Sequence, residues 1–88
     1  MASMRLRIRG RVQGIGFRWF VRMHARRLQL AGWVENQADG SVEVAASGAP
    51  EKLDELSRVV RRGPDGAEIS TVEELPPPDD LEGPFAIR

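Results

Sequence analysis

The hydrophobic period of the sequence changes at a pair of glycines near the N-terminus. Before them, in residues 5–12, arginine occupies every second position, and Leu6, Ile8 and Val12 lie on the opposite face. This period of two predicts a half-buried strand with one wet face. From residue 17 onward the apolar side chains recur at helical spacing instead, at Phe17, Phe20, Val21, His24 and Leu28. The chain must therefore turn from a strand into an amphipathic helix within residues 13–16.

The rest of the chain repeats these patterns. Residues 33–36 and 41–46 read as strands around Asp39-Gly40, which is a hairpin signal. A second helix is expected from Pro50 to the stop at Gly63-Pro64, because acidic residues fill its start and arginines its end, as the helix dipole favours. Its buried stripe is formed by Leu53, Leu56 and Val60. Residues 67–73 and 85–88 add a strand and a short final strand.

This order of elements predicts an α+β fold. Each helix has one apolar stripe and the first strand has one apolar face, so we expect a two-layer sandwich with one sheet face covered. The 88 residues form one domain over 1–88. Residues 1–3 are expected to be a disordered extension. Residues 76–82, which begin with three prolines, read as a stiff acidic loop rather than a linker between domains.

Charge is distributed unevenly although the net charge is zero. Every charged residue before Glu35 is an arginine, an arrangement suited to an anionic ligand. For most of these arginines we favour a plainer interpretation, in which they pair with the later acids across the sheet. The chain has no cysteine, which excludes disulfides and fits a cytoplasmic protein. It also has no apolar run long enough for a membrane span and no cluster of metal ligands, so we expect no membrane, metal or cofactor.

The turn between strand and helix lies in GRVQGIGFRWF, residues 10–20. Gly14 and Gly16 permit backbone angles closed to other residues, and the first N–H groups of a helix have no partner within it. N–H groups from Gln13 to Arg18 can thus converge on a tetrahedral anion, with the guanidinium closing over it. On the local pattern alone, a tight turn with Arg18 serving solubility is equally favoured. A positive charge at a helix start opposes the dipole, and this favours a bound anion.

The same stretch resembles the acylphosphatase family. The resemblance continues through Gly32-Trp33-Val34-Glu35-Asn36, the segment from Asp39 to Val44, Gly63-Pro64 and Ala67, and covers about Met4 to Arg88. It implies a ferredoxin-like βαββαβ sandwich, with an antiparallel sheet and two helices on one face, and metal-free hydrolysis of carboxyl-phosphate anhydrides.

The resemblance also implies the site residues. It places the catalytic roles on Arg18, which binds phosphate, and Asn36, which positions water. The phosphate-binding residues are then Gln13, Gly14, Ile15, Gly16, Phe17 and Arg18. Spacing alone favours a different interpretation of Asn36, in which its amide caps the turn at residues 37–40.

Three other side chains invite functional interpretations. His24 is the only histidine, but it lies nearly two turns into the helix, so we expect it to pack rather than act as a base. Trp19 and Trp33 could stack on a ligand, but we expect them to anchor the core or an edge, which is the usual role of such residues. Glu35 should point away from the face of Asn36.

The function that we expect is acyl phosphate hydrolysis by a monomer, with acyl phosphate and inorganic phosphate as its ligands. The alternative is a non-catalytic phosphoanion-binding module, or an accessory domain of a carbamoyl- or acyl-transferring partner. RNA binding ranks third, because the wet face of the first strand lacks aromatic residues for stacking and the net charge is not basic.

Overall fold

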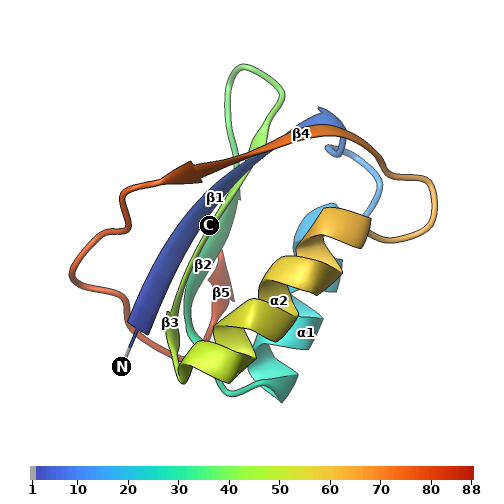
Figure 1. Cartoon of the computed structure of the whole chain (residues 1–88). Helices are drawn as coiled ribbons and strands as arrows, with labels where there is room; N and C mark the ends of the chain where they lie inside the picture. The colour runs from blue at the N-terminus through green and yellow to red at the C-terminus, as the bar shows by residue number, and fades with distance from the viewer. Residues whose placement is uncertain (1) are drawn as a thin grey trace.

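The computed structural model describes residues 2–88. Along the chain it has seven elements (Figure 1), with these bounds: β1 Ala2–Arg11, α1 Phe17–Arg27, β2 Ala31–Asn36, β3 Val42–Gly48, α2 Pro50–Arg62, β4 Glu68–Leu75 and β5 Ala86–Ile87. The predicted order of strands and helices is confirmed. α1 begins at Phe17 and α2 spans Pro50–Arg62, as predicted, whereas α1 ends at Arg27, before the last apolar residue of its predicted stripe, Leu28.

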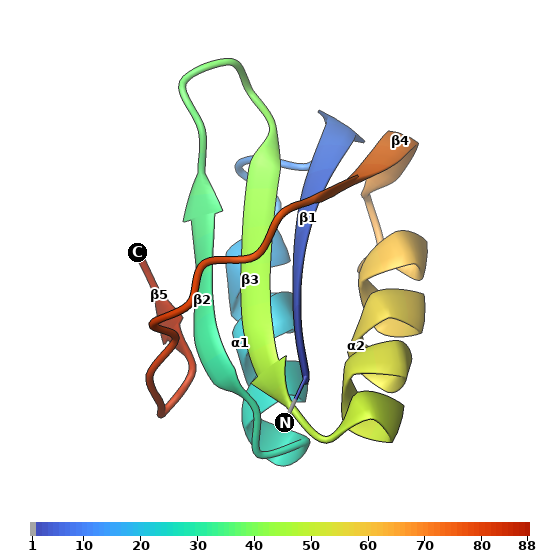
Figure 2. The same cartoon turned by 60° about the vertical axis from the view of Figure 1, so that its left-hand side comes forward.

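The sheet has five strands in the order β4-β1-β3-β2-β5. The first four pair antiparallel, with Leu6 opposite Val44 and Val34 opposite Val44 from the other side. β5 instead runs parallel to β2, with Val34 opposite Ile87. The expectation of an antiparallel sheet is therefore wrong for the last strand. The reason is the path of residues 76–85, which cross the sheet to its far edge before the chain turns back (Figure 2).

Both helices cover the same face of the sheet (Figure 2). The buried side chains of α1 are Phe17, Val21 and Ala25, at the predicted helical spacing. Those of α2 include Leu53, Leu56 and Val60, also as predicted. The buried side chains of both helices pack against the apolar face of the sheet. The resulting core includes Leu6, Ile8, Val12, Val34, Val44 and Phe85. The α+β two-layer sandwich is confirmed.

The opposite face of the sheet carries the arginines of β1. Arg5 and Arg7 each donate two hydrogen bonds to the carboxylate of Glu43, whose side chain is only 4% exposed. Arg9 pairs with Asp39 and Glu73. The interpretation that these arginines pair with later acids is confirmed for Arg5, Arg7 and Arg9.

The N-terminal end of β1 differs from the expectation. Ala2 and Ser3 pair with Gly48 and Ser47 of β3, so a disordered extension is wrong for these two residues. They are ordered because β3 continues far enough to offer them backbone partners. Met1, the remaining residue of the expected extension, lies outside the described residues.

The segment after β4 returns to the sheet as predicted. It crosses the face opposite the helices (Figure 2), and the carbonyl of Glu82 accepts a hydrogen bond from the Gly32 N–H at 3.0 Å. Phe85 is fully buried and Ala86–Ile87 forms β5. Neither helix described here has the length and apolarity that a membrane span requires.

Candidate active site

A small cavity of about 90 Å³ opens at the start of α1. It lies where the β1–α1 loop and the end of β2 come together, at the same end of the sheet as the β2–β3 hairpin (Figure 2). Its walls combine glycines of the loop, the first turn of α1 and one residue each from β2 and β5. The lining residues are Val12, Gly14, Gly16, Phe17, Arg18, Trp19, Asn36 and Ile87.

The loop beside the cavity has the backbone conformation that its glycines allow. Gly14 has φ of 77° and Gly16 has φ of 79°, both in the left-handed region. A Cβ at either position would meet no atom within 4 Å, so the backbone faces open space there. Because these two residues have no side chain, a ligand can approach the main chain there.

The N-terminus of α1 has no capping side chain. Gly16 is the cap residue, and its carbonyl accepts a hydrogen bond from the Phe20 N–H at 3.0 Å. Within residues 2–88, no protein acceptor is found for the N–H groups of residues 14–19. The first turn also has no acidic side chain. The positive end of the helix dipole thus faces the cavity without a protein anion to balance it.

Arg18 is half-buried in the first turn of α1 and lines the cavity. Unlike Arg5, Arg7 and Arg9, it forms no ion pair with any carboxylate of the described chain. Its guanidinium therefore remains available for an anion, which it can bind with two parallel hydrogen bonds.

Asn36 reaches the same cavity from the last position of β2. Its Oδ1 atom is buried and has no hydrogen-bond partner within residues 2–88. A buried amide oxygen without a partner is rare, because desolvation without a hydrogen bond costs free energy. The alternative role as a turn cap falls to another residue, since Asp39 Oδ1 accepts from both the N–H and the hydroxyl of Ser41.

Gln13 fixes the loop to the hairpin. Its side-chain Nε2 donates to the carbonyl oxygens of Gln37 and Ser41, at 2.9 Å in each case. These bonds tie the loop that holds Gly14 to the strand end that holds Asn36. Gln13 and Ile15 do not line the cavity. Their predicted role in phosphate binding is therefore limited to their backbone N–H groups.

Most of the site residues predicted from the sequence thus lie close together in the structure. Gly14, Gly16, Phe17, Arg18 and Asn36 come together around one cavity, as predicted. Sequence reasoning missed two lining residues and misjudged one. Val12 and Ile87 carried no signal beyond their apolar character, and Ile87 reaches the site only through the pairing of β5 with β2. Trp19 is 65% exposed, so the expectation that it anchors the core or an edge is wrong.

The other candidates lie away from the cavity. His24 packs edge-on against Phe20, with 4.6 Å between ring centroids, and burial lowers its pKa. Glu35 accepts a hydrogen bond from Gln37 and lies beside Arg88. Trp33 lies under the guanidinium of Arg88. None of these three lines the cavity, as predicted for His24 and Glu35.

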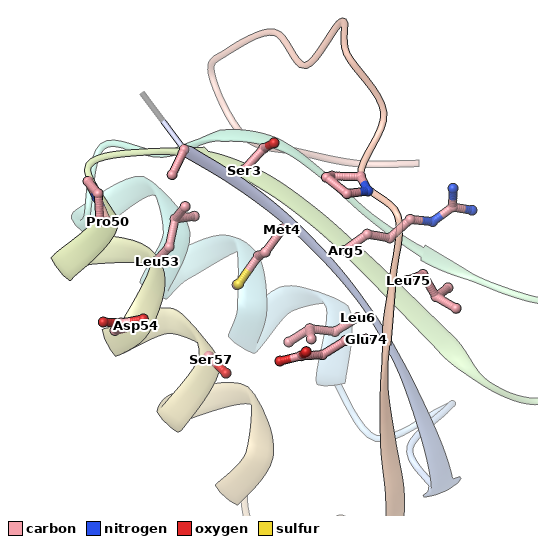
Figure 3. A pocket seen from close by; sticks show the side chains of 12 residues that line it. Ser3, Met4, Arg5, Leu6, Pro50, Leu53, Asp54, Ser57, Glu74 and Leu75 are labelled. Carbon is pink, nitrogen blue, oxygen red and sulfur yellow. The ribbon is translucent and has the colours of Figure 1, made fainter.

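A larger cavity of about 350 Å³ lies elsewhere, between β1, β4 and α2 (Figure 3). Met4 and Leu6 point into it from β1, whereas Arg5 points to the opposite face of the sheet. Its carboxylates, Asp54 and Glu74, would repel an anion. It shares no residue with the cavity at Arg18, which is the better candidate for an anion site despite its smaller size.

Comparisons with known proteins give the relatives of this chain. The family model described as acylphosphatase matches residues 4–87. An acylphosphatase of Koribacter versatilis (strain Ellin345) is 52% identical over 71 residues, which cover 81% of this chain and 64% of that protein. The crystal structure of acylphosphatase from Bacillus subtilis has a TM-score of 0.93 at 35% identity, and the match covers 100% of this chain and 99% of that one.

The fold also occurs within a longer protein. The structure of T. kodakarensis HypF matches 99% of this chain with a TM-score of 0.83 and 27% identity, but only 12% of that chain is covered. The family match extends over residues 4–87, nearly the whole length described here. The chain belongs to the acylphosphatase family, and the comparisons support a hydrolase that acts on acyl phosphates.

Proposed function

We propose that the chain hydrolyses the carboxyl–phosphate bond of acyl phosphates without a metal ion, at the cavity between the β1–α1 loop and Asn36. The observation that carries the proposal is the meeting, at one small cavity, of a helix N-terminus with a guanidinium and a buried amide oxygen that have no partner among residues 2–88. In this proposal the N–H groups of residues 13–18 and Arg18 hold the phosphoryl oxygens. Asn36 Oδ1 accepts a hydrogen bond from the attacking water.

The reaction suits a site without an acid catalyst. The carboxylate leaving group has a conjugate acid with a pKa near 4, by comparison with Asp and Glu side chains. An alkoxide leaving group would have one closer to that of water, about 15.7. A carboxylate therefore departs without receiving a proton, and the protein needs only to hold the phosphoryl group, spread its charge and orient water in line.

The bonds and protons balance as follows. The water oxygen forms a bond to phosphorus while the bond from phosphorus to the carboxyl oxygen breaks. The electron pair of that bond leaves with the carboxylate. The amide of Asn36 can orient the water but cannot take its proton, so the proton passes to the phosphate product or to solvent.

The test is hydrolysis of benzoyl phosphate in excess chelator by the native protein and three variants. Arg18→Ala is expected to lower turnover roughly 10²-fold, by analogy with removal of one transition-state donor. Arg18→Lys should restore little, because an ammonium cannot form the two parallel hydrogen bonds of a guanidinium. Arg27→Ala is the matched control, since Arg27 is an exposed arginine at the far end of the same helix. Near-native turnover by Arg18→Ala would remove this residue from the mechanism.

A second candidate function is an accessory domain without turnover. The match to a small part of T. kodakarensis HypF favours it, because there the fold serves as one segment of a longer chain. Stabilisation of the protein by phosphate with no hydrolysis of any acyl phosphate would support this function instead.

Two finer expectations belong to the same proposal. We propose that the monomer is active, because Arg18, the helix N-terminus and Asn36, the groups that the proposed reaction uses, meet at one cavity within a single chain. A cytoplasmic location stays a prediction from the absence of cysteine.

A further inference from the structure

The cavity is too small to enclose a whole substrate. Its volume of about 90 Å³ is smaller than the roughly 150 Å³ of a cavity that holds one benzene molecule. A phosphoryl group and an attacking water fill such a space. The acyl group must then lie outside the cavity, against whatever side chains form its rim.

Trp19 is the most exposed large side chain at that rim. It directly follows Arg18 in the first turn of α1, lines the cavity and is 65% exposed. Single exposed apolar residues are common, so exposure alone has no meaning here. The position is what matters, because the ring forms part of the cavity wall and also reaches solvent, so a group that extends outward from the phosphoryl site can contact it.

The indole ring is also held in place. The guanidinium carbon of Arg22, one turn farther along α1, lies 4.4 Å from the ring centroid. This cation–π contact covers one part of the aromatic surface and limits the movement of the ring. What remains exposed is a flat, fixed aromatic surface at the mouth of an anion site. A flat acyl group can stack there, whereas a small aliphatic group offers little area for contact.

We propose that Trp19, held by Arg22, is the acyl-binding surface of this site and that it favours aromatic acyl phosphates over small aliphatic ones. The inference rests on the proposed function of the cavity. It makes Trp19 a specificity-determining residue rather than a catalytic one, since the transferred phosphoryl group stays with Arg18 and the loop. Arg22 acts as a positioning residue for the ring.

The test compares kcat/KM for benzoyl phosphate and acetyl phosphate, each measured with the native protein and with Trp19→Ala, Trp19→Phe and Met23→Ala. Each variant is compared with the native protein on the same substrate, so the intrinsic reactivities of the two substrates cancel. Met23→Ala is the matched control, because Met23 is a second exposed apolar side chain of α1, 48% exposed, that does not line the cavity.

Trp19→Ala is expected to lower kcat/KM for benzoyl phosphate roughly three- to tenfold, mainly through KM, and that for acetyl phosphate by less than about twofold. Trp19→Phe should retain most of the preference, and Met23→Ala should leave both values unchanged. An equal loss on both substrates, or no loss on either, would overturn the acyl-binding role and leave the proposed function standing. If the native protein hydrolyses neither substrate, the proposed function fails, and this inference fails with it.

Discussion

Replacement of Asn36 by leucine separates a catalytic role of this residue from a structural one. Asn36 Oδ1 is buried without a partner in the described chain, and a buried polar group in that state costs about 1–3 kcal/mol. Leucine has a similar shape and no polar atom. Asn36→Leu should therefore leave the free energy of unfolding unchanged or raise it by up to about the same amount. For a domain of this size, each 1 kcal/mol raises the Tm by about 4–8 °C.

Activity should move in the opposite direction. Without the amide oxygen the attacking water loses its orientation, and misplacement of a reacting group lowers the rate roughly 10²-fold. The assay pairs urea or thermal unfolding with turnover of benzoyl phosphate in excess chelator. Asn36→Ala, which cannot overpack the site, should show the same loss of turnover. One hydrogen bond contributes about 1 kcal/mol to the free energy of unfolding. If a variant loses at least that much stability but keeps its turnover, Asn36 supports the hairpin and not the reaction.

Two further predictions concern the charged face of the sheet. Glu43→Gln should lower the free energy of unfolding, measured by urea titration, by about 1–3 kcal/mol. The reason is that the nearly buried carboxylate of Glu43 pairs with both Arg5 and Arg7, which are partly exposed. An unchanged free energy of unfolding would contradict a stabilising role for this cluster. Hydrogen bonds from Ser41, first from its hydroxyl and to a smaller extent from its N–H, lower the pKa of Asp39 from 3.8 to about 2. The ionised carboxylate therefore contributes fully to the stability of the fold above pH 3.8, and this contribution is lost as the pH falls through about 2. Asp39→Asn should flatten the stability profile in that acidic range, and an unchanged profile would refute the assignment.

Local patterns were enough to predict most of the fold. The change from a period of two to helical spacing located β1 and α1, and the charge order of residues 50–62 located α2, because each pattern reports which face of its own element is buried. What could not be predicted depends on distant partners. Ala2 and Ser3 are ordered only because β3 extends to Gly48, and β5 runs parallel only because of the route taken by residues 76–85.

The same division applies to the site. The local pattern around Gly14 and Gly16 left an anion site and a plain tight turn equally favoured, and the family resemblance supplied the site residues, including the role of Asn36. Ile87 could not be predicted, since it arrives through the register of β5 against β2. Trp19 was misjudged because its type suggests burial, whereas its position on α1 lies off the buried stripe of Phe17, Val21 and Ala25. For a residue on a helix, angular position decides exposure more than hydrophobicity does.

The central claim is that main-chain N–H groups at the start of α1, together with Arg18, bind a tetrahedral anion. The most direct measurement is a titration of the protein with inorganic phosphate, followed by amide proton and nitrogen chemical shifts. The account predicts saturable shifts that are largest for the backbone amides of residues 14–18 and the side-chain amide of Asn36, and that disappear in Arg18→Ala. Phosphate binding that leaves those amides unmoved, or that shifts residues around the larger cavity beside α2 instead, would contradict it.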